Sequence, residues 1–174
     1  MFKIKIFLLV VVAFVALPQV SAAYFTTAQT ATKLDADTFL FTVTYRFGLD
    51  GRDLRMPVLS RRGLSSALVP YAGYVIQNDG KRTIEKGDAY SIVLSDAKVL
   101  GNEYFVPAGK VSTFTLVTVL KLTPEMIAVA DEESKLSLLM TNLPFTMTEE
   151  GKDIPARLNP SELQYYKTPA LSIK

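Results

Sequence analysis

One stretch of the sequence restricts the fold more than any other: TFLFTVTYRFGL, from Thr38 to Leu49. Large apolar side chains alternate there with threonine, arginine and one leucine. Residues two apart lie on the same face of a strand, so the pattern predicts a long β-strand with one buried face. That face is expected to contain Phe39, Phe41, Val43, Tyr45 and Phe47.

Further strands are predicted along most of the chain. A pattern apolar on both faces at residues 110–122 predicts a central strand of a sheet. The other segments with strand-like composition are residues 22–34, 67–77, 88–100, 103–109, 135–147 and 169–174.

Helix signals are few and short. Thr123 precedes a proline and a glutamate, and Asn159 precedes a proline with Glu162 three residues after the asparagine. Both patterns are typical of helix N-termini. Together the elements predict an all-β fold, an antiparallel immunoglobulin-like β-sandwich of about seven to nine strands with one or two short helices in loops.

Two segments also resemble a known kind of domain. The stretch YFVPAGKVSTFTLVTVLK (Tyr104 to Lys121), followed by SKLSLLMTNL, resembles bacterial exported immunoglobulin-like or fibronectin-III-like domains. The immunoglobulin cysteine pair and core tryptophan are absent, because the chain has neither residue type. The resemblance implies adhesion, assembly or ligand presentation and brings no catalytic residues. One such module needs about 100 residues, so spare residues are expected in a Gly48–Ser66 loop and a Thr146–Thr168 tail.

The N-terminus predicts export. Lys3 and Lys5 precede an apolar run that ends before Pro18, and small residues follow. The run is shorter than the roughly 18–20 residues of a membrane-spanning helix, which favours a signal peptide over residues 1–22, with cleavage after Ala22 or, as second choice, after Ala23. An uncleaved membrane anchor is the alternative. A single domain over residues 23–174, bacterial and secreted or held in the cell envelope, is expected.

Composition excludes several functions. Loss of the two signal lysines leaves 17 basic residues against 17 acidic ones, so a field that attracts nucleic acid is not expected. The chain has no histidine and no cysteine, which excludes Ser-His-Asp and cysteine nucleophiles and zinc sites made of those residues. The acidic residues cluster near turns, where solvation explains them. No cofactor, metal site or catalytic residue is predicted.

Five arginines fall between residues 46 and 62, and they are the first candidates for a partner-binding surface. Guanidinium groups pair planar acids with two hydrogen bonds, so Arg52, Arg55, Arg61 and Arg62 are the predicted contact residues. The alternatives are a solvated loop whose arginines pair with Asp50 and Asp53, or a protease-sensitive loop. Within this stretch, residues 56–60 are predicted to form a short edge strand that Pro57 protects from other chains.

Tyr165 and Tyr166 are the second candidates for partner binding, because aromatic rings can stack on a ligand. Adjacent residues of an extended segment face opposite sides, however, so the two rings would not share a surface there.

The predicted function is a non-catalytic binding, adhesion or envelope module that contacts a protein or glycan at the cell surface. The alternative is a homo-oligomeric subunit of a surface layer or filament, in which an edge strand such as residues 24–33 completes a neighbour's sheet. A carbohydrate-active enzyme is the third hypothesis.

Overall fold

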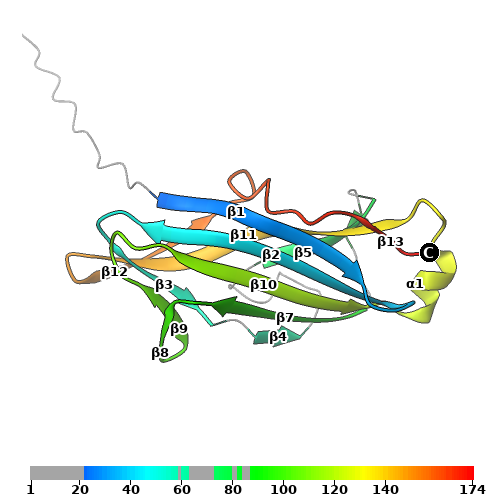
Figure 1. Cartoon of the computed structure of the whole chain (residues 1–174), viewed down its shortest axis with the longest axis horizontal. Coiled ribbons are helices and arrows are strands. Elements are labelled where there is room, and N and C mark those ends of the chain that lie inside the picture. Colours follow the sequence, from blue (N-terminus) through cyan, green and yellow to red (C-terminus); the bar gives the residue numbers. More distant parts are fainter. Residues whose placement is uncertain (1–21, 59, 63–72, 80–81, 84–86) are drawn as a thin grey trace, which may run out of the picture.

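The computed structural model describes residues 22–58, 60–62, 73–79, 82–83 and 87–174. These residues form two antiparallel β-sheets and one short helix, in a β-sandwich-like arrangement (Figure 1). The predicted all-β class is therefore confirmed. The described residues contain thirteen strands, more than the seven to nine predicted, because several strands have only two to four residues.

The smaller sheet has five strands, in the order β1-β2-β10-β7-β4. β10 lies in the middle of this order, as its two apolar faces predict, and β1, paired with β2, stands at one end of the order. The strands are β1 (Ala22–Lys33), β2 (Thr38–Leu49), β10 (Ser112–Lys121), β7 (Asp88–Ser95) and β4 (Ser60–Arg62).

The larger sheet has eight strands, six of them in the order β6-β5-β11-β3-β9-β8. The two others, β12 and β13, both pair with β11, the longest strand. The strands are β3 (Asp53–Pro57), β5 (Gly73–Asn78), β6 (Arg82–Thr83), β8 (Lys98–Leu100), β9 (Glu103–Val106), β11 (Lys135–Glu149), β12 (Lys152–Leu158) and β13 (Leu171–Ser172).

The alternating pattern of β2 supplies the centre of the core. Its five predicted apolar residues, from Phe39 to Phe47, are all fully buried, while Arg46 between them is exposed. Burying one such side chain stabilises the fold by roughly 1.5–3 kcal/mol, so the sum over five positions opposes any shift of the strand by one residue.

Aromatic rings from the two sheets meet in the core. Phe47 of β2 lies edge-on to Phe145 of β11, with ring centroids 4.9 Å apart and planes at 85°. Tyr104 of β9 packs in the same manner on Phe114 of β10, at 5.9 Å and 77°. The Tyr104 hydroxyl donates to the carbonyl of Val93 at 2.8 Å, so this buried polar group is satisfied within the core.

A chain of three buried hydroxyls also joins the sheets. The Tyr74 hydroxyl of β5 is 2.6 Å from the Ser91 hydroxyl of β7, which is 3.0 Å from the Thr118 hydroxyl of β10. Ser91 and Thr118 are fully buried and Tyr74 is 2% exposed. Water cannot replace a missing partner at such depth, so each hydroxyl depends on its neighbour.

The first predicted helix is confirmed as α1 (Pro124–Val129), at one end of the molecule (Figure 1). Thr123 is its N-cap, and its hydroxyl accepts a hydrogen bond from the Met126 N–H at 3.4 Å. The proline at N1 and the acidic residue in the first turn complete the signal read from the sequence.

The second predicted helix, near Asn159, does not form. Its cap does: the Asn159 N–H donates to the Glu162 carboxylate at 2.8 Å. The following residues make turns instead, because Tyr166 enters the core and its carbonyl accepts the Met140 N–H of β11 at 3.0 Å. Tertiary pairing has overridden the local helix signal.

Four predictions about the strands and the segments between them are wrong. Residues 88–100 form two strands, β7 and β8, which belong to different sheets. The chain turns at Asp96, whose side chain accepts the Thr113 N–H at 2.9 Å and whose own N–H donates to the Thr113 carbonyl. At this turn the chain therefore crosses from the smaller sheet to the larger one.

The expected Gly48–Ser66 loop is also wrong, since it contains β3 and β4. The predicted edge strand at residues 56–60 does not form as one element: Met56 and Pro57 end β3, which lies between β11 and β9, and Ser60 begins β4. The expected tail at Thr146–Thr168 likewise contains the end of β11 and all of β12. Within the described residues, no helix is long and apolar enough to cross a membrane.

Candidate binding groove on the larger sheet

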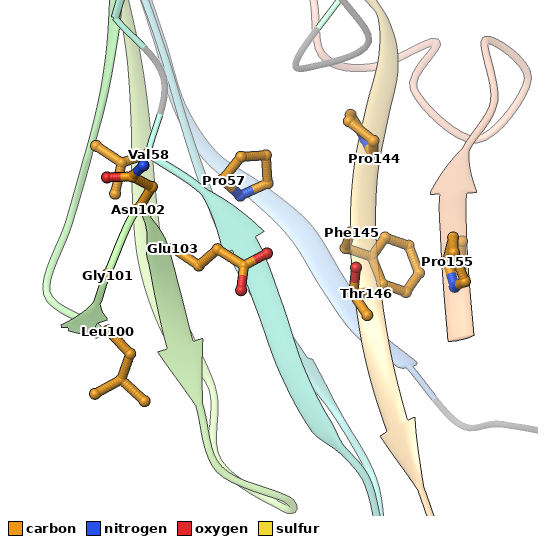
Figure 2. Close-up of a pocket in the computed structure, with 11 residues that line it drawn as sticks. Pro57, Val58, Leu100, Gly101, Asn102, Glu103, Pro144, Phe145, Thr146 and Pro155 are labelled. Carbon is orange, nitrogen blue, oxygen red and sulfur yellow. The ribbon is translucent and has the colours of Figure 1, made fainter. Parts of the chain in front are cut away.

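The larger sheet forks where β3 leaves β11. Residues 53–55 of β3 pair with residues 146–148 of β11, whereas Met56 and Pro57 pair, among the described residues, only with β9. Beyond this point the two strands diverge, and a groove opens between them (Figure 2).

Two prolines explain the fork. Extending the β3–β11 register by two residues would place Pro57 opposite Pro144. The Val58 N–H donates to the Asn102 carbonyl on the β9 side at 2.8 Å. Peptide groups of successive residues point to opposite sides of a strand, so the peptide group of Pro57 faces β11. Neither proline has an N–H to donate, and the ladder ends there.

The groove has a volume of about 870 Å³ and is mostly apolar. Leu100 and Val58 at its border are 43% and 40% exposed, so both add accessible apolar surface to the groove. The lining comes from β3, β8, β9, β11 and β12 and from the residues that follow β3 and β8. Its apolar members are Pro57, Val58, Leu100, Pro144, Phe145, Pro155 and Ala156.

One carboxylate lines this apolar site. Among the described lining residues, Glu103 alone is charged, and Asn102 and Thr146 add neutral polar groups. Glu103 is opposite Pro57 in the β3–β9 ladder, and its carboxylate lies over β3, beside the fork (Figure 2). The site therefore combines a hydrophobic wall with one negative charge.

Two ion pairs lie beside the groove. The guanidinium of Arg52, the residue before β3, lies 2.5 Å from the Glu149 carboxylate, and the Arg52 side chain is 12% exposed. Arg55 lies 3.2 Å from Asp153 in a more exposed pair. The interpretation that these arginines pair with Asp50 and Asp53 is thus wrong: their partners come from the β11–β12 hairpin, about a hundred residues along the chain.

The predicted arginines do not form one patch. Arg52 and Arg55 belong to the larger sheet, whereas Arg61 and Arg62 are on β4, at the edge of the smaller sheet. The backbones of Arg61 and Arg62 pair with Ser91 and Tyr90 of β7, and their side chains lie outside the described part of the structure.

The two predicted tyrosines lie in different environments, although the chain turns here and is not extended. Tyr165 is 74% exposed, and its carbonyl accepts a hydrogen bond from Gln29 of β1 at 3.3 Å. Tyr166 is buried and packs on Tyr45, with ring centroids 5.7 Å apart. Of this pair, only Tyr165 is on the surface.

A second hollow, of about 700 Å³, lies beside the loop after α1. It is lined by acidic residues, among them Asp79, Asp131 and Glu133, together with Lys135 and Lys167. The Ser134 hydroxyl donates to Asp131 at 2.8 Å, and this hydrogen bond lowers the pKa of that carboxyl. Within the described ranges, no group of three or more acidic residues is arranged to hold a metal ion.

Sequence reasoning missed the groove because its residues are far apart. Pro57, Pro144 and Pro155 stand in three strands, where proline is unusual, and that was the available signal. Only the register brings them together: Pro155 is opposite Thr146, which is opposite Arg55.

Comparison with known proteins gives no relative: the chain matches no family model, no curated protein and no solved structure. The function must therefore be argued from the site.

Proposed function

We propose that this chain is an exported, non-catalytic binding module with an immunoglobulin-like sandwich, secreted or held at a bacterial cell surface, where it contacts a partner protein. The signal-like N-terminus supports export, and the balanced charge after its removal supports a partner other than nucleic acid. Adhesion and envelope assembly are the roles that suit such a module.

The groove between β3 and β11 is the observation on which this proposal depends. Its walls are strand residues and prolines, whose conformations are restricted before any partner arrives. A preformed site avoids the free-energy cost of ordering loops on binding. Concave, largely apolar surfaces with a few polar groups are the usual form of binding sites.

Retention on cells tests the proposal. Labelled protein is added to cells of the producing organism, and bound fluorescence is measured for the wild type, Leu100→Asp and Val129→Asp. Leu100 borders the groove, whereas Val129 is an exposed residue of α1 near the opposite end of the molecule (Figure 1). We expect Leu100→Asp to reduce retention about tenfold, the equivalent of losing one well-packed apolar contact, and Val129→Asp to bind like the wild type.

Two results would count against the proposal. Wild-type protein that is not retained on any cell surface contradicts binding at the surface. Equal retention of wild type and Leu100→Asp places the contact elsewhere on the molecule. Retention that is lost after enzymatic removal of surface glycans, and kept after proteolysis, identifies a glycan as the partner.

Assembly into a layer or filament is the second candidate function, and the β1 edge favours it. β1 is twelve residues long and contains no proline, and β2 is its ladder partner within the part of the chain that the structure describes. A long edge without proline can pair with another chain. In the structure this strand completes its own sheet, so assembly would add a neighbour at the free edge of β1.

Light scattering after size-exclusion chromatography distinguishes the two functions. Edge pairing predicts multimers whose fraction rises with concentration. The Leu34 N–H donates to the Thr38 carbonyl, so even-numbered residues in this part of β1 bond to β2 and the Ala31 N–H faces the free edge. Ala31→Pro should therefore reduce the multimers, because proline removes that donor. A monomer at every concentration would eliminate this second candidate and leave the first intact.

A further inference from the structure

We infer that the groove between β3 and β11 receives the basic side chain, arginine or lysine, of a partner polypeptide. The inference rests on the proposed binding function and specifies the chemistry of the partner.

Hydrogen-bond acceptors facing the fork are the first reason. The carboxylate of Glu103 lies over β3, beside the fork, and lines the groove (Figure 2). The peptide group of Pro57 faces β11, as shown above, so its carbonyl points into the fork.

The carbonyl of Pro144 faces the fork from the other strand. Glu149 and Lys152 flank the two-residue turn of the β11–β12 hairpin, and both turn residues have positive φ. In such a hairpin the flanking residues exchange hydrogen bonds, so odd-numbered residues of β11 point to β12. Pro144 therefore points to the β3 side, where none of the strand residues that the structure describes is paired with it.

A ligand that only donates hydrogen bonds fits this arrangement. Two carbonyls and one carboxylate accept, and the two prolines supply no N–H in return. Among the described lining side chains, only the neutral groups of Asn102 and Thr146 can donate, and both can also accept. Arginine and lysine side chains carry donors and no acceptors. Hydrogen bonds from a charged donor to a carboxylate are also stronger than neutral ones, particularly in an apolar setting.

The apolar lining suits the aliphatic part of an arginine or lysine side chain. Both basic residues have long aliphatic stems that pack on apolar surface while the charged group reaches a polar partner. Leu100, Pro57 and Pro155 provide that surface here. A volume of about 870 Å³ is near the upper end of the roughly 300–1,000 Å³ that drug-sized ligands occupy, so the groove can also take residues that flank the basic one.

The two neighbouring arginines, Arg55 and Arg157, do not neutralise the Glu103 carboxylate. Arg55 is already paired with Asp153, 3.2 Å away. Arg157 is opposite Pro144 on β12 and is not part of the lining. Binding of an acidic ligand by Arg157 is therefore the competing possibility, and a glutamate peptide tests it.

Peptides that differ at one position test the inference. The probes are acetylated, amidated pentapeptides Ala-Val-X-Val-Ala, in which X is arginine, citrulline or glutamate. Citrulline has nearly the shape of arginine without its charge. Binding is followed by the amide chemical shifts of the purified, isotope-labelled protein, for the wild type, Glu103→Gln and the control Glu133→Gln, which removes an exposed acid outside the groove.

We expect the arginine peptide to shift the amides of Gly101, Asn102 and Thr146 and to bind about tenfold more tightly than the citrulline peptide, a ratio suited to one charge-assisted contact. Glu103→Gln should abolish that difference, and Glu133→Gln should keep it. Equal binding of arginine and citrulline, preference for glutamate, or no shift at these amides would overturn the inference.

The inference and the proposed function fail separately. If Leu100→Asp loses retention on cells while the arginine peptide does not bind, the groove binds a partner of other chemistry and only the inference falls. If the wild type is not retained on cells at all, the proposed function falls, whatever the peptides do.

Discussion

Removal of the Ser91 hydroxyl should destabilise the protein more than removal of the whole buried hydroxyl chain. Ser91 stands between Tyr74 and Thr118, at 2.6 and 3.0 Å, and all three are at most 2% exposed. In Ser91→Ala, two buried hydroxyls lose a shared partner that water cannot replace. A buried polar group without a partner costs roughly 1–3 kcal/mol, so we expect a loss of about 2–4 kcal/mol in the free energy of unfolding.

The triple variant Tyr74→Phe/Ser91→Ala/Thr118→Val leaves no hydroxyl unsatisfied and keeps nearly the same side-chain volumes. Replacing both partners of a hydrogen bond by apolar groups of similar shape can be almost neutral. We therefore expect the triple variant to lose about 1 kcal/mol or less, although it has two more substitutions. The change in unfolding free energy of the triple variant should differ from the sum of the changes in the three single variants, because substitutions of contacting residues are not additive.

Urea and thermal unfolding followed by circular dichroism measure both effects. A loss of about 2–4 kcal/mol lowers the melting temperature by roughly 5–15 °C in a protein of this size. Ser161→Ala, an exposed serine in the turn after β12, is the control and should change little. If Ser91→Ala costs less than about 0.5 kcal/mol, a typical value for neutral surface substitutions, or if the triple variant is as unstable as the sum of its parts, the hydroxyl chain does not hold the sheets as argued.

Three further outcomes follow from single sites. Gly48→Ala should cost roughly 3 kcal/mol or more in unfolding free energy, because its Cβ would lie 2.0 Å from a backbone carbonyl of the turn before β10; a stable Ala variant would show that this turn can move. Arg52→Gln should lower the urea midpoint more than Arg55→Gln, since Arg52 is 12% exposed and Arg55 is 37% exposed; the reverse order would refute the burial argument. Ser134→Ala should raise the pKa of Asp131 toward 3.8, as a carboxyl titration by NMR would detect. The lowered pKa stabilises the folded state above about pH 3.8, and that contribution is lost as the pH falls through the folded value; an unchanged pKa in the variant would contradict it.

The candidate site depended on information that no local pattern contains. Prolines in three separate strands could be noted from the sequence, but the fork arises because Pro57 would fall opposite Pro144 in the register. Arg52 and Arg55 were predicted as partner-contact residues, and the structure places both in ion pairs within the chain. Their partners, Glu149 and Asp153, are distant in the chain and were not identified.

The sequence by itself determined the all-β class, the buried face of β2, the central place of β10 and the N-cap of α1. Each of these follows from residues within about a dozen positions of one another: a period of two selects one buried face, and a threonine before a proline caps a helix. The tertiary structure decided how many strands form and which sheet each joins. It divided residues 88–100 between two sheets, replaced the helix near Asn159 by turns and made strands of the expected loop at residues 48–66. The physical reason is that pairing and core burial, which act between distant residues, outweigh the small local preferences that a sequence pattern expresses.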